Sequence, residues 1–345
     1  MLPEVCMGLA ILCLTAYAVF GGADFGAGFW DLTAGGARRG GRIRALLIRS
    51  MTPVWEANHV WLPFLLVVLW TAFPVFFGSI MSTLLVPLLL GTVGIILRGA
   101  AFALRGQAET VGEARALGAM FAISSVAVPF AFGAALGAIA SDRVPVGNAT
   151  GDTFGSWVNP TGITVGVLSV LTGAFLAAVF LAGDAVRAGL DDLERAFRVR
   201  ALVAGILTGA IALGSLLMLR SDAPRLYEGL TSGAGLALVL ASAVAGGGTV
   251  ALVAARRHEL ARVTASAAVA CVTVGWAVGL GTELLPGLTL EEAAAGDATL
   301  TALLVSVAVG MVLLVPSMWL LFRLALRGDL GGEFEPLDRT LGPKR

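Results

Sequence analysis

Two acidic residues and a histidine stand inside apolar stretches of this sequence, where charged groups are uncommon. Asp24 lies in GGADFGAGFWDL, and Glu56 and His59 lie in VWEANHVW. A carboxylate at the centre of a membrane-spanning helix costs about 2.5–3.5 kcal/mol on insertion scales, and less near the interface. Each acid is therefore expected to face protein or water, where it could take up and release protons.

These residues also admit structural interpretations. Asp24 and Glu56 could simply hydrogen-bond a neighbouring helix. Glu56 and His59 are three positions apart and share a helix face, so His59 either belongs to the same proton pathway or is a hydrogen-bonded packing residue. Arg98 and Arg105, at the end of a later apolar stretch, either reach out to the membrane surface or act as counter-ions for the acids.

The histidines and cysteines argue against a metal site in this chain. A Glu-x-x-His motif occurs in di-iron bundles, but these need a second such motif and two further glutamates. The other histidine, His258 in ARRHEL, is expected on a solvated surface. A haem held by two histidines is excluded too, which leaves open only His59 paired with a methionine. Cys6, Cys13 and Cys271 lack CxxC spacing and are expected to be small buried apolar residues.

The composition is that of an integral membrane protein. Of the 345 residues, 57% are hydrophobic and 13% are charged, whereas soluble domains have about 25% charged residues. The net charge of zero gives no reason to propose a nucleic-acid partner. The N-terminal apolar stretch lacks a basic leader and contains Glu4, so it is expected to be the first helix and not a signal peptide.

Nine stretches are long and apolar enough to cross roughly 30 Å of hydrocarbon. They are expected at about 6–28, 50–72, 75–97, 116–140, 161–183, 201–219, 232–254, 263–282 and 300–322. An outer N-terminus places 20 of the 23 Lys and Arg residues on the inner side, which predicts a cytoplasmic C-terminus. Asp24 and Glu56 then lie at similar depth, near the inner ends of the first two helices. Residues 141–163 and 281–300 are expected to form irregular outer loops.

Four motifs occur in one order along the chain: GGADFGAGFWDL, TPVWEANHVWL, TAFP at 71–74 and LRGAAFALRG at 97–106. Together they resemble subunit II of cytochrome bd-type quinol oxidases. The order, spacing and number of helices match over the first four helices, and the later ones agree in topology and in Asn159-Pro160. Where better-known bacterial members have W-D-G-N, this chain has Trp55-Glu56-Ala57-Asn58. The glutamate keeps the carboxyl group but reaches one methylene further.

The resemblance implies a respiratory terminal oxidase in the cytoplasmic (inner) membrane of a prokaryote, which oxidises quinol and reduces O2 to water. In that family a haem-bearing subunit I holds two b-type haems and one d-type haem, and subunit II forms a heterodimer with it. Asp24 and Glu56 match the family's acids associated with proton delivery from the cytoplasm. The quinone type, a structural quinone in this chain and small accessory subunits are left open.

With this resemblance, we expect an all-α membrane protein with nine transmembrane helices, arranged as two four-helix bundles and one peripheral helix. The expected units are a first bundle at 1–140, an extracytoplasmic loop at 141–160, a second bundle at 161–282, and an acidic outer loop, ninth helix and cytoplasmic tail at 283–345. Two alternatives remain: an ion-coupled secondary transporter that uses Asp24 and Glu56 as an acid pair, and a purely structural partner subunit.

Overall fold

The computed structural model describes residues 1–35, 37–52, 55–108 and 110–327. This part of the chain is helical, apart from its loops and one two-stranded hairpin. Eight of its helices are long and apolar enough to cross a membrane: Leu2–Leu32, Leu85–Gln107, Val111–Ala140, Pro160–Arg187, Asp191–Asp222, Gly233–Ala254, His258–Leu280 and Asp297–Leu321. The expectation of an all-α membrane protein is confirmed. Its predicted cytoplasmic tail after Arg327 lies outside the described residues.

The first long helix changes its winding near the middle. It consists of α1 (Leu2–Ala16), a π-helical turn η1 (Tyr17–Gly21) and α2 (Gly22–Leu32). A π-helical turn is a local widening of the helix that is frequent at functional sites. A Cβ atom on Gly21 would lie 2.8 Å from the Tyr17 ring, so only glycine lets that ring fold back along the turn.

The predicted second and third spans are interrupted by prolines. The chain forms five helices in this region: α3 (Ala37–Met51), α4 (Trp55–His59), α5 (Trp61–Ala72), α6 (Pro74–Thr83) and α7 (Leu85–Leu104). Pro63, Pro74 and Pro87 lie just after the breaks between α4 and α5, between α5 and α6, and between α6 and α7. Proline lacks an N–H and its ring clashes with the carbonyl four residues earlier, which ends the preceding helix. The stretch predicted at 50–72 is thus divided into short helices that end at Ala72, and the bounds predicted at 75–97 are wrong because the long apolar helix there runs from Leu85 to Gln107.

Two of the remaining helices begin at clear capping signals. Thr110 and Glu113 form a capping box at the start of α8, and Asn159 accepts a hydrogen bond from the Gly162 amide at the start of α9, with Pro160 in its first turn. The helices that follow α7, apart from the short α14, are η2 (Arg105–Gln107), α8 (Val111–Ala140), α9 (Pro160–Arg187), α10 (Asp191–Asp222), α11 (Pro224–Thr231), α12 (Gly233–Ala254), α13 (His258–Leu280) and α15 (Asp297–Arg327).

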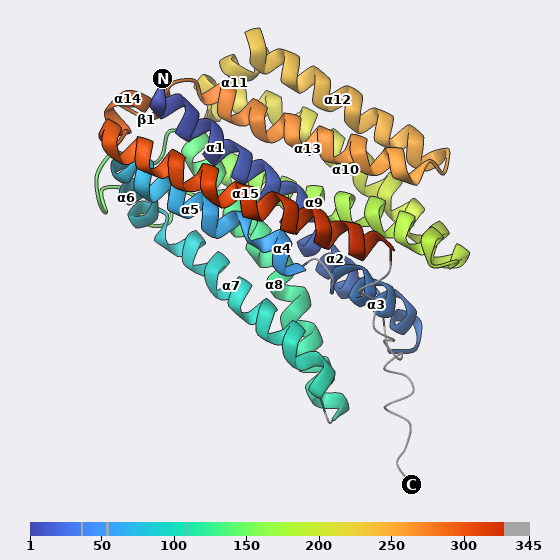
Figure 1. Cartoon of the computed structure of the whole chain (residues 1–345). Coiled ribbons are helices and arrows are strands. Elements are labelled where there is room, and N and C mark those ends of the chain that lie inside the picture. The colour runs from blue at the N-terminus through green and yellow to red at the C-terminus, as the bar shows by residue number, and fades with distance from the viewer. Residues whose placement is uncertain (36, 53–54, 109, 328–345) are drawn as a thin grey trace.

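The segment at 281–300 is ordered, which corrects the expectation of an irregular loop. Strands β1 (Glu283–Leu285) and β2 (Leu288–Thr289) pair antiparallel, with Gly287 at a positive φ of 77° in the turn. Helix α14 (Leu290–Ala293) follows and has its own capping box. Figure 1 places the N-terminus beside this hairpin.

Helix α9 lies at the centre of the molecule, where it contacts α2, α8, α10 and α13. Figure 1 shows α7 and α8 on one side and α10, α12 and α13 on the other. The α2 and α9 backbones touch, since a Cβ atom on Gly26 would lie 1.8 Å from the Gly173 carbonyl oxygen. Glycine at position 26 thus allows the two helix backbones to approach closely.

Apolar side chains fill the space on both sides of this crossing. One cluster includes Cys6 and Cys13, which are fully buried as predicted, while Cys271 is only partly buried. The other cluster joins α2, α3, α9 and α10 through residues such as Phe175 and Phe197. The packed apolar side chains fix the helices against one another, so the polar groups between them have defined neighbours.

Candidate functional site: a buried carboxyl network

Asp24 is the central acid of the site. It lies in the first turn of α2 and is only 4% exposed. Asn58 on α4 donates from Nδ2 to Asp24 Oδ2 at 3.0 Å, and His59 Nε2 lies 3.9 Å from the same oxygen. The short helix α4 thus brings two polar side chains onto the buried carboxyl group.

Arg98 on α7 links this acid to two further helices. Its guanidinium group donates from Nη2 to the Asp24 carbonyl oxygen at 2.9 Å, from Nη1 to His59 Nε2 at 3.2 Å and from Nε to Ser125 Oγ at 3.0 Å. The group also stacks on the Phe25 ring at 4.9 Å. Arg98 is only 3% exposed, so it does not reach out to the membrane surface. It places a positive charge beside Asp24 without contacting the carboxylate.

The contact with Arg98 determines the protonation state of His59. A guanidinium group has only donors and does not lose its proton in proteins. His59 Nε2 must therefore accept this hydrogen bond, and the ring is neutral with its proton on Nδ1.

Arg105, the other expected counter-ion, pairs with an acid that the sequence reasoning missed. It donates to Asp31 Oδ2 at 2.8 Å, while Arg44 donates to Asp31 Oδ1 at 2.6 Å. Asp31 is buried and lies seven residues after Asp24. That spacing is two helical turns and could have placed both aspartates on one face. Arg105 therefore neutralises Asp31 and contacts neither Asp24 nor Glu56.

Glu56 is exposed at the surface of the chain, while Asn58 on the same helix is buried. Residues two positions apart are separated by about 200° around a helix, so the Glu56 and Asn58 side chains point to opposite sides of α4. The described contacts join Asp24 to Asn58 and His59 and leave Glu56 apart from them. Asn58, Tyr17 and Ser125 were missed by the sequence reasoning, because neutral side chains carry no signal of misplaced charge.

His258 does not lie on a solvated surface, which corrects the prediction. It is the first residue of α13 and is 6% exposed. Its Nε2 atom lies 3.1 Å from Oε1 of the buried Glu194 on α10. The preceding arginines made the segment look solvated, but the chain folds this side chain under the turn.

The residues present do not fit a haem. Among the described residues, no group of three or more His, Cys, Asp or Glu side chains could hold a metal ion. His59 Nε2 is occupied by Arg98, and His258 Nε2 faces Glu194. Neither imidazole thus presents Nε2 as an axial ligand. The chemistry that this network supports is proton binding by a carboxyl group in a polar, enclosed setting.

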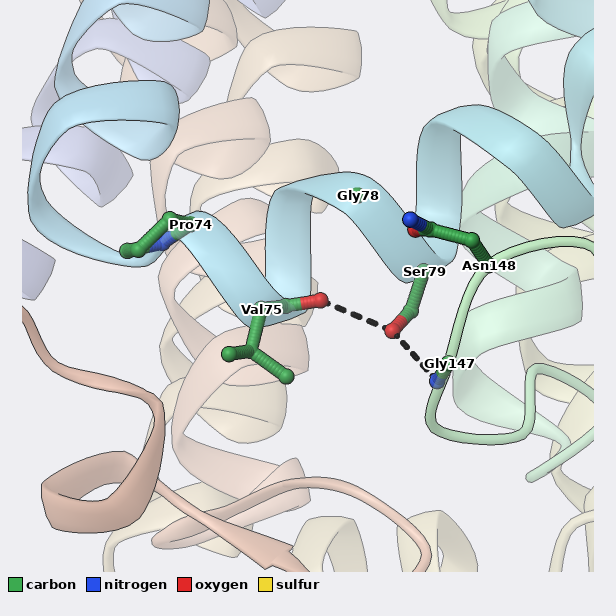
Figure 2. Close-up of a pocket in the computed structure, with 6 residues that line it drawn as sticks. All are labelled: Pro74, Val75, Gly78, Ser79, Gly147 and Asn148. Carbon is green, nitrogen blue, oxygen red and sulfur yellow. Dashed lines mark hydrogen bonds between the residues drawn. The ribbon is translucent and has the colours of Figure 1, made fainter.

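A hollow of about 350 Å³ lies elsewhere, between α6 and the loop before α9. Figure 2 shows Ser79 joining the two, since its hydroxyl donates to the Val75 carbonyl oxygen and accepts from the Gly147 amide. Asn148 lies over Gly78 at the rim. None of the residues that line the hollow belongs to the Asp24 network.

Known proteins resemble the chain over most of its length. The family model described as "Cytochrome bd terminal oxidase subunit II" matches residues 2–325. A Bacillus subtilis (strain 168) protein named "Putative cytochrome bd menaquinol oxidase subunit II" is 25% identical over 224 residues, which are 62% of this chain and 61% of that protein. The match thus spans about three fifths of the relative.

A solved structure has the same fold. A chain in the structure of bd oxidase from Geobacillus thermodenitrificans superposes with a TM-score of 0.72 at 24% identity, over 94% of this chain and 98% of that one. The fold, the apolar helices and the family match agree over nearly the whole length. The chain is therefore a multi-pass protein of a prokaryotic membrane and belongs to the cytochrome bd terminal oxidase subunit II family.

Proposed function

We propose that this chain is the haem-free subunit of a quinol oxidase that reduces O2 to water, and that it delivers protons through Asp24 and Glu56. The proposal rests on family membership and, above all, on the buried Asp24 carboxyl group, which is held by Asn58 beside Arg98. The catalytic haems belong to the partner subunit in this proposal, because the two histidines of this chain are engaged elsewhere.

The neighbours of the two buried aspartates support different roles for them. Asp31 is held between Arg44 and Arg105, so both of its oxygens are paired with cations. Asp24 accepts a hydrogen bond from a neutral amide, and within the described residues no arginine forms an ion pair with its carboxylate. A carboxyl group without a direct cation partner changes its protonation state at a smaller electrostatic cost. Asp24 is thus suited to relay protons and Asp31 to hold the structure.

The exposure of Glu56 supports a partner subunit. A carboxylate at the surface of a membrane helix is costly against lipid and normally faces protein or a water-filled cavity. Apolar side chains of α7, including Leu89, Val93 and Ile96, are also exposed. We propose that the haem-bearing subunit I covers α4 and forms a heterodimer with this chain. Glu56 would then receive protons at that interface and pass them to the Asp24 network.

We further propose that α4 and α5 together make a ninth crossing. They cover residues 55–72, and a helical segment of that length spans about 27 Å. The Ala72 carbonyl oxygen, at the end of α5, accepts a hydrogen bond from the Ala295 amide at 2.8 Å. Ala295 lies between α14 and α15, and Figure 1 shows α14 beside the N-terminus. This contact supports a membrane crossing by α4 and α5 that begins near α3 and ends on the side where the N-terminus lies.

With nine crossings and an outer N-terminus, the segments on the inner side of the membrane contain most of the Lys and Arg residues, as the positive-inside rule predicts. The proposed units remain two bundles, at 1–140 and 161–282, with a ninth helix after them. No observation favours the transporter alternative over the family assignment.

The oxidase proposal is tested by coexpressing the chain with its partner and purifying the complex through a tag on this chain. We expect a d-type haem band in the reduced-minus-oxidised spectrum. Asp24→Asn and Glu56→Gln should each lower quinol oxidation by about 100-fold, the size of a lost proton-transfer group, with unchanged haem content. Glu291→Gln, at an exposed site on α14, is the control and should retain full turnover.

A complex without haem would refute the oxidase assignment. Full turnover in both acid variants would instead support the purely structural alternative.

A further inference from the structure

Four buried polar atoms near Asp24 have no hydrogen-bond partner among the described residues. They are Tyr17 Oη, Asn58 Oδ1, His59 Nδ1 and Trp61 Nε1. Buried polar side-chain atoms are nearly always hydrogen-bonded in folded proteins, so several unpaired atoms in one region need an explanation.

The side chains that carry these atoms are neighbours. The Tyr17 and His59 rings have centroids 5.8 Å apart, and Trp61 packs against the apolar cluster that contains Tyr17. Asn58 precedes His59 on α4 and uses its Nδ2 group to bind Asp24. The π-helical turn η1 supplies Tyr17, α4 supplies Asn58 and His59, and α5 supplies Trp61, and α4 contacts both η1 and α5.

The hydrogen-bonding capacities of the four atoms are complementary. His59 Nδ1 carries the proton because Arg98 donates to Nε2, so it is a donor. Trp61 Nε1 is also a donor, Asn58 Oδ1 is an acceptor, and the Tyr17 hydroxyl is both. Water can satisfy donors and acceptors together, and a buried water typically makes about three hydrogen bonds to such groups.

We propose that Tyr17, Asn58, His59 and Trp61 bind ordered water beside Asp24, and that His59 is a neutral positioning residue in this site. A second proton on His59 would displace the hydrogen bond from Arg98 Nη1, which lies 3.2 Å from Nε2, and would place two cations in contact. The proton therefore travels over water: a hydronium ion gives its proton to the Asp24 carboxylate and becomes water. This role of the site rests on the proposed function, whereas the water binding does not.

The water site is tested by electron cryomicroscopy of the purified complex at a resolution that shows ordered water. We expect density within hydrogen-bond distance of at least three of the four atoms. Tyr17→Phe should remove part of this density, while Tyr227→Phe, which changes the only other tyrosine of the chain, should leave it unchanged. Absence of the density, or pairing of the four atoms with partner residues, would overturn the inference.

The role of His59 is tested with two substitutions. Glutamine can accept from Arg98 and donate to water but takes up no proton, so His59→Gln should keep most of the turnover and the wild-type pH profile. His59→Leu should lower the turnover by about tenfold, because Arg98 loses a hydrogen-bond acceptor. If His59 carried the proton itself, the turnover of both variants would fall by about 100-fold, and the positioning role would be refuted.

Haem content measured on each complex separates a failure of assembly from a loss of proton transfer. If the His59 variants do not assemble, the water density in the wild-type and Tyr17→Phe complexes still decides the inference. A complex with the density but without quinol oxidation would refute the proposed function and leave the water site standing. An active oxidase without the density would refute the water site alone.

Discussion

Single residues determine how closely the helices approach and which acids are paired with arginines. Asp24 and Asp31 lie on one helix, yet one binds a neutral amide and the other two arginines. Removing one partner of a buried ion pair leaves an uncompensated charge, so Asp31 and its arginines are needed as a group. Gly26 is needed for helix packing, because the backbone of α9 occupies the space that a side chain at this position would fill.

Gly26→Ala is expected to destabilise the complex by about 1–3 kcal/mol, the usual cost of an overpacked core. The added Cβ would lie 1.8 Å from the Gly173 carbonyl oxygen, so α2 and α9 must separate. Thermal denaturation of the purified complex measures the effect. Gly209→Ala is the control, because no atom lies within 4 Å of a Cβ at that exposed position on α10. Equal effects of the two substitutions would contradict the packing argument.

At the scale of elements, short and distorted helices position the site while long regular ones hold it. The π-helical turn η1 supplies Tyr17, and the break at Val60 separates α4 from α5. Both features turn side chains to directions that a continuous helix would not allow. The loop before α9 is likewise ordered by local hydrogen bonds that connect it to the start of that helix.

The stability of the turn at Asp152 is expected to depend on pH. The Asp152 carboxylate accepts hydrogen bonds from the Phe154 and Gly155 amides, each at 2.8 Å, and these bonds hold its pKa below the ordinary value of 3.8. Since the pKa is lowered by folding, the stabilisation is fully present above that ordinary value and is lost as the pH falls through the lowered one.

Hydrogen exchange of residues 154–156, corrected for intrinsic rates, measures this effect. Protection should be constant near neutral pH and should decrease in strong acid. Asp152→Ala should lose protection at every pH, whereas Asp152→Asn keeps an acceptor and should not respond to acid in this range. Identical exchange in the three proteins would show that the side chain does not hold the turn.

At the scale of the whole molecule, the proposed ninth crossing decides which segments share a side of the membrane. With that crossing, residues 41 and 150 lie on opposite sides; without it, they lie on the same side. Both positions are exposed. Gly41 has nothing within 4 Å of an added Cβ, so a cysteine fits there without strain.

Labelling of single cysteines in intact cells tests this arrangement. In a background where Cys271 is replaced by serine, Thr150→Cys should react with a membrane-impermeant maleimide. Gly41→Cys should react only after the membrane is permeabilised. The buried Cys6 and Cys13 are expected to stay unreacted. Labelling of both positions from outside, or of neither position until the membrane is permeabilised, would contradict the nine-crossing proposal.

The sequence by itself determined the membrane class, most of the spans and the placement of the Asp24 side chain against protein. Apolar length and the cost of an intramembrane charge are local properties, so they can be read without knowing which helices meet. The capping residue Asn159 is local in the same sense, and the predicted start of that helix agrees with the structure to within one or two residues. Proline also acts locally, but the sequence alone does not show whether a proline bends a span or divides it into two helices.

Only the tertiary structure decided which polar groups meet. Arg105 could have paired with several acids, and its partner Asp31 follows from how α2 and the end of α7 pack. The exposure of Glu56 and the burial of His258 depend on the rotation of each helix about its axis. That rotation is set by contacts between segments far apart in the sequence, such as Gly26 with Gly173, and no local pattern specifies them.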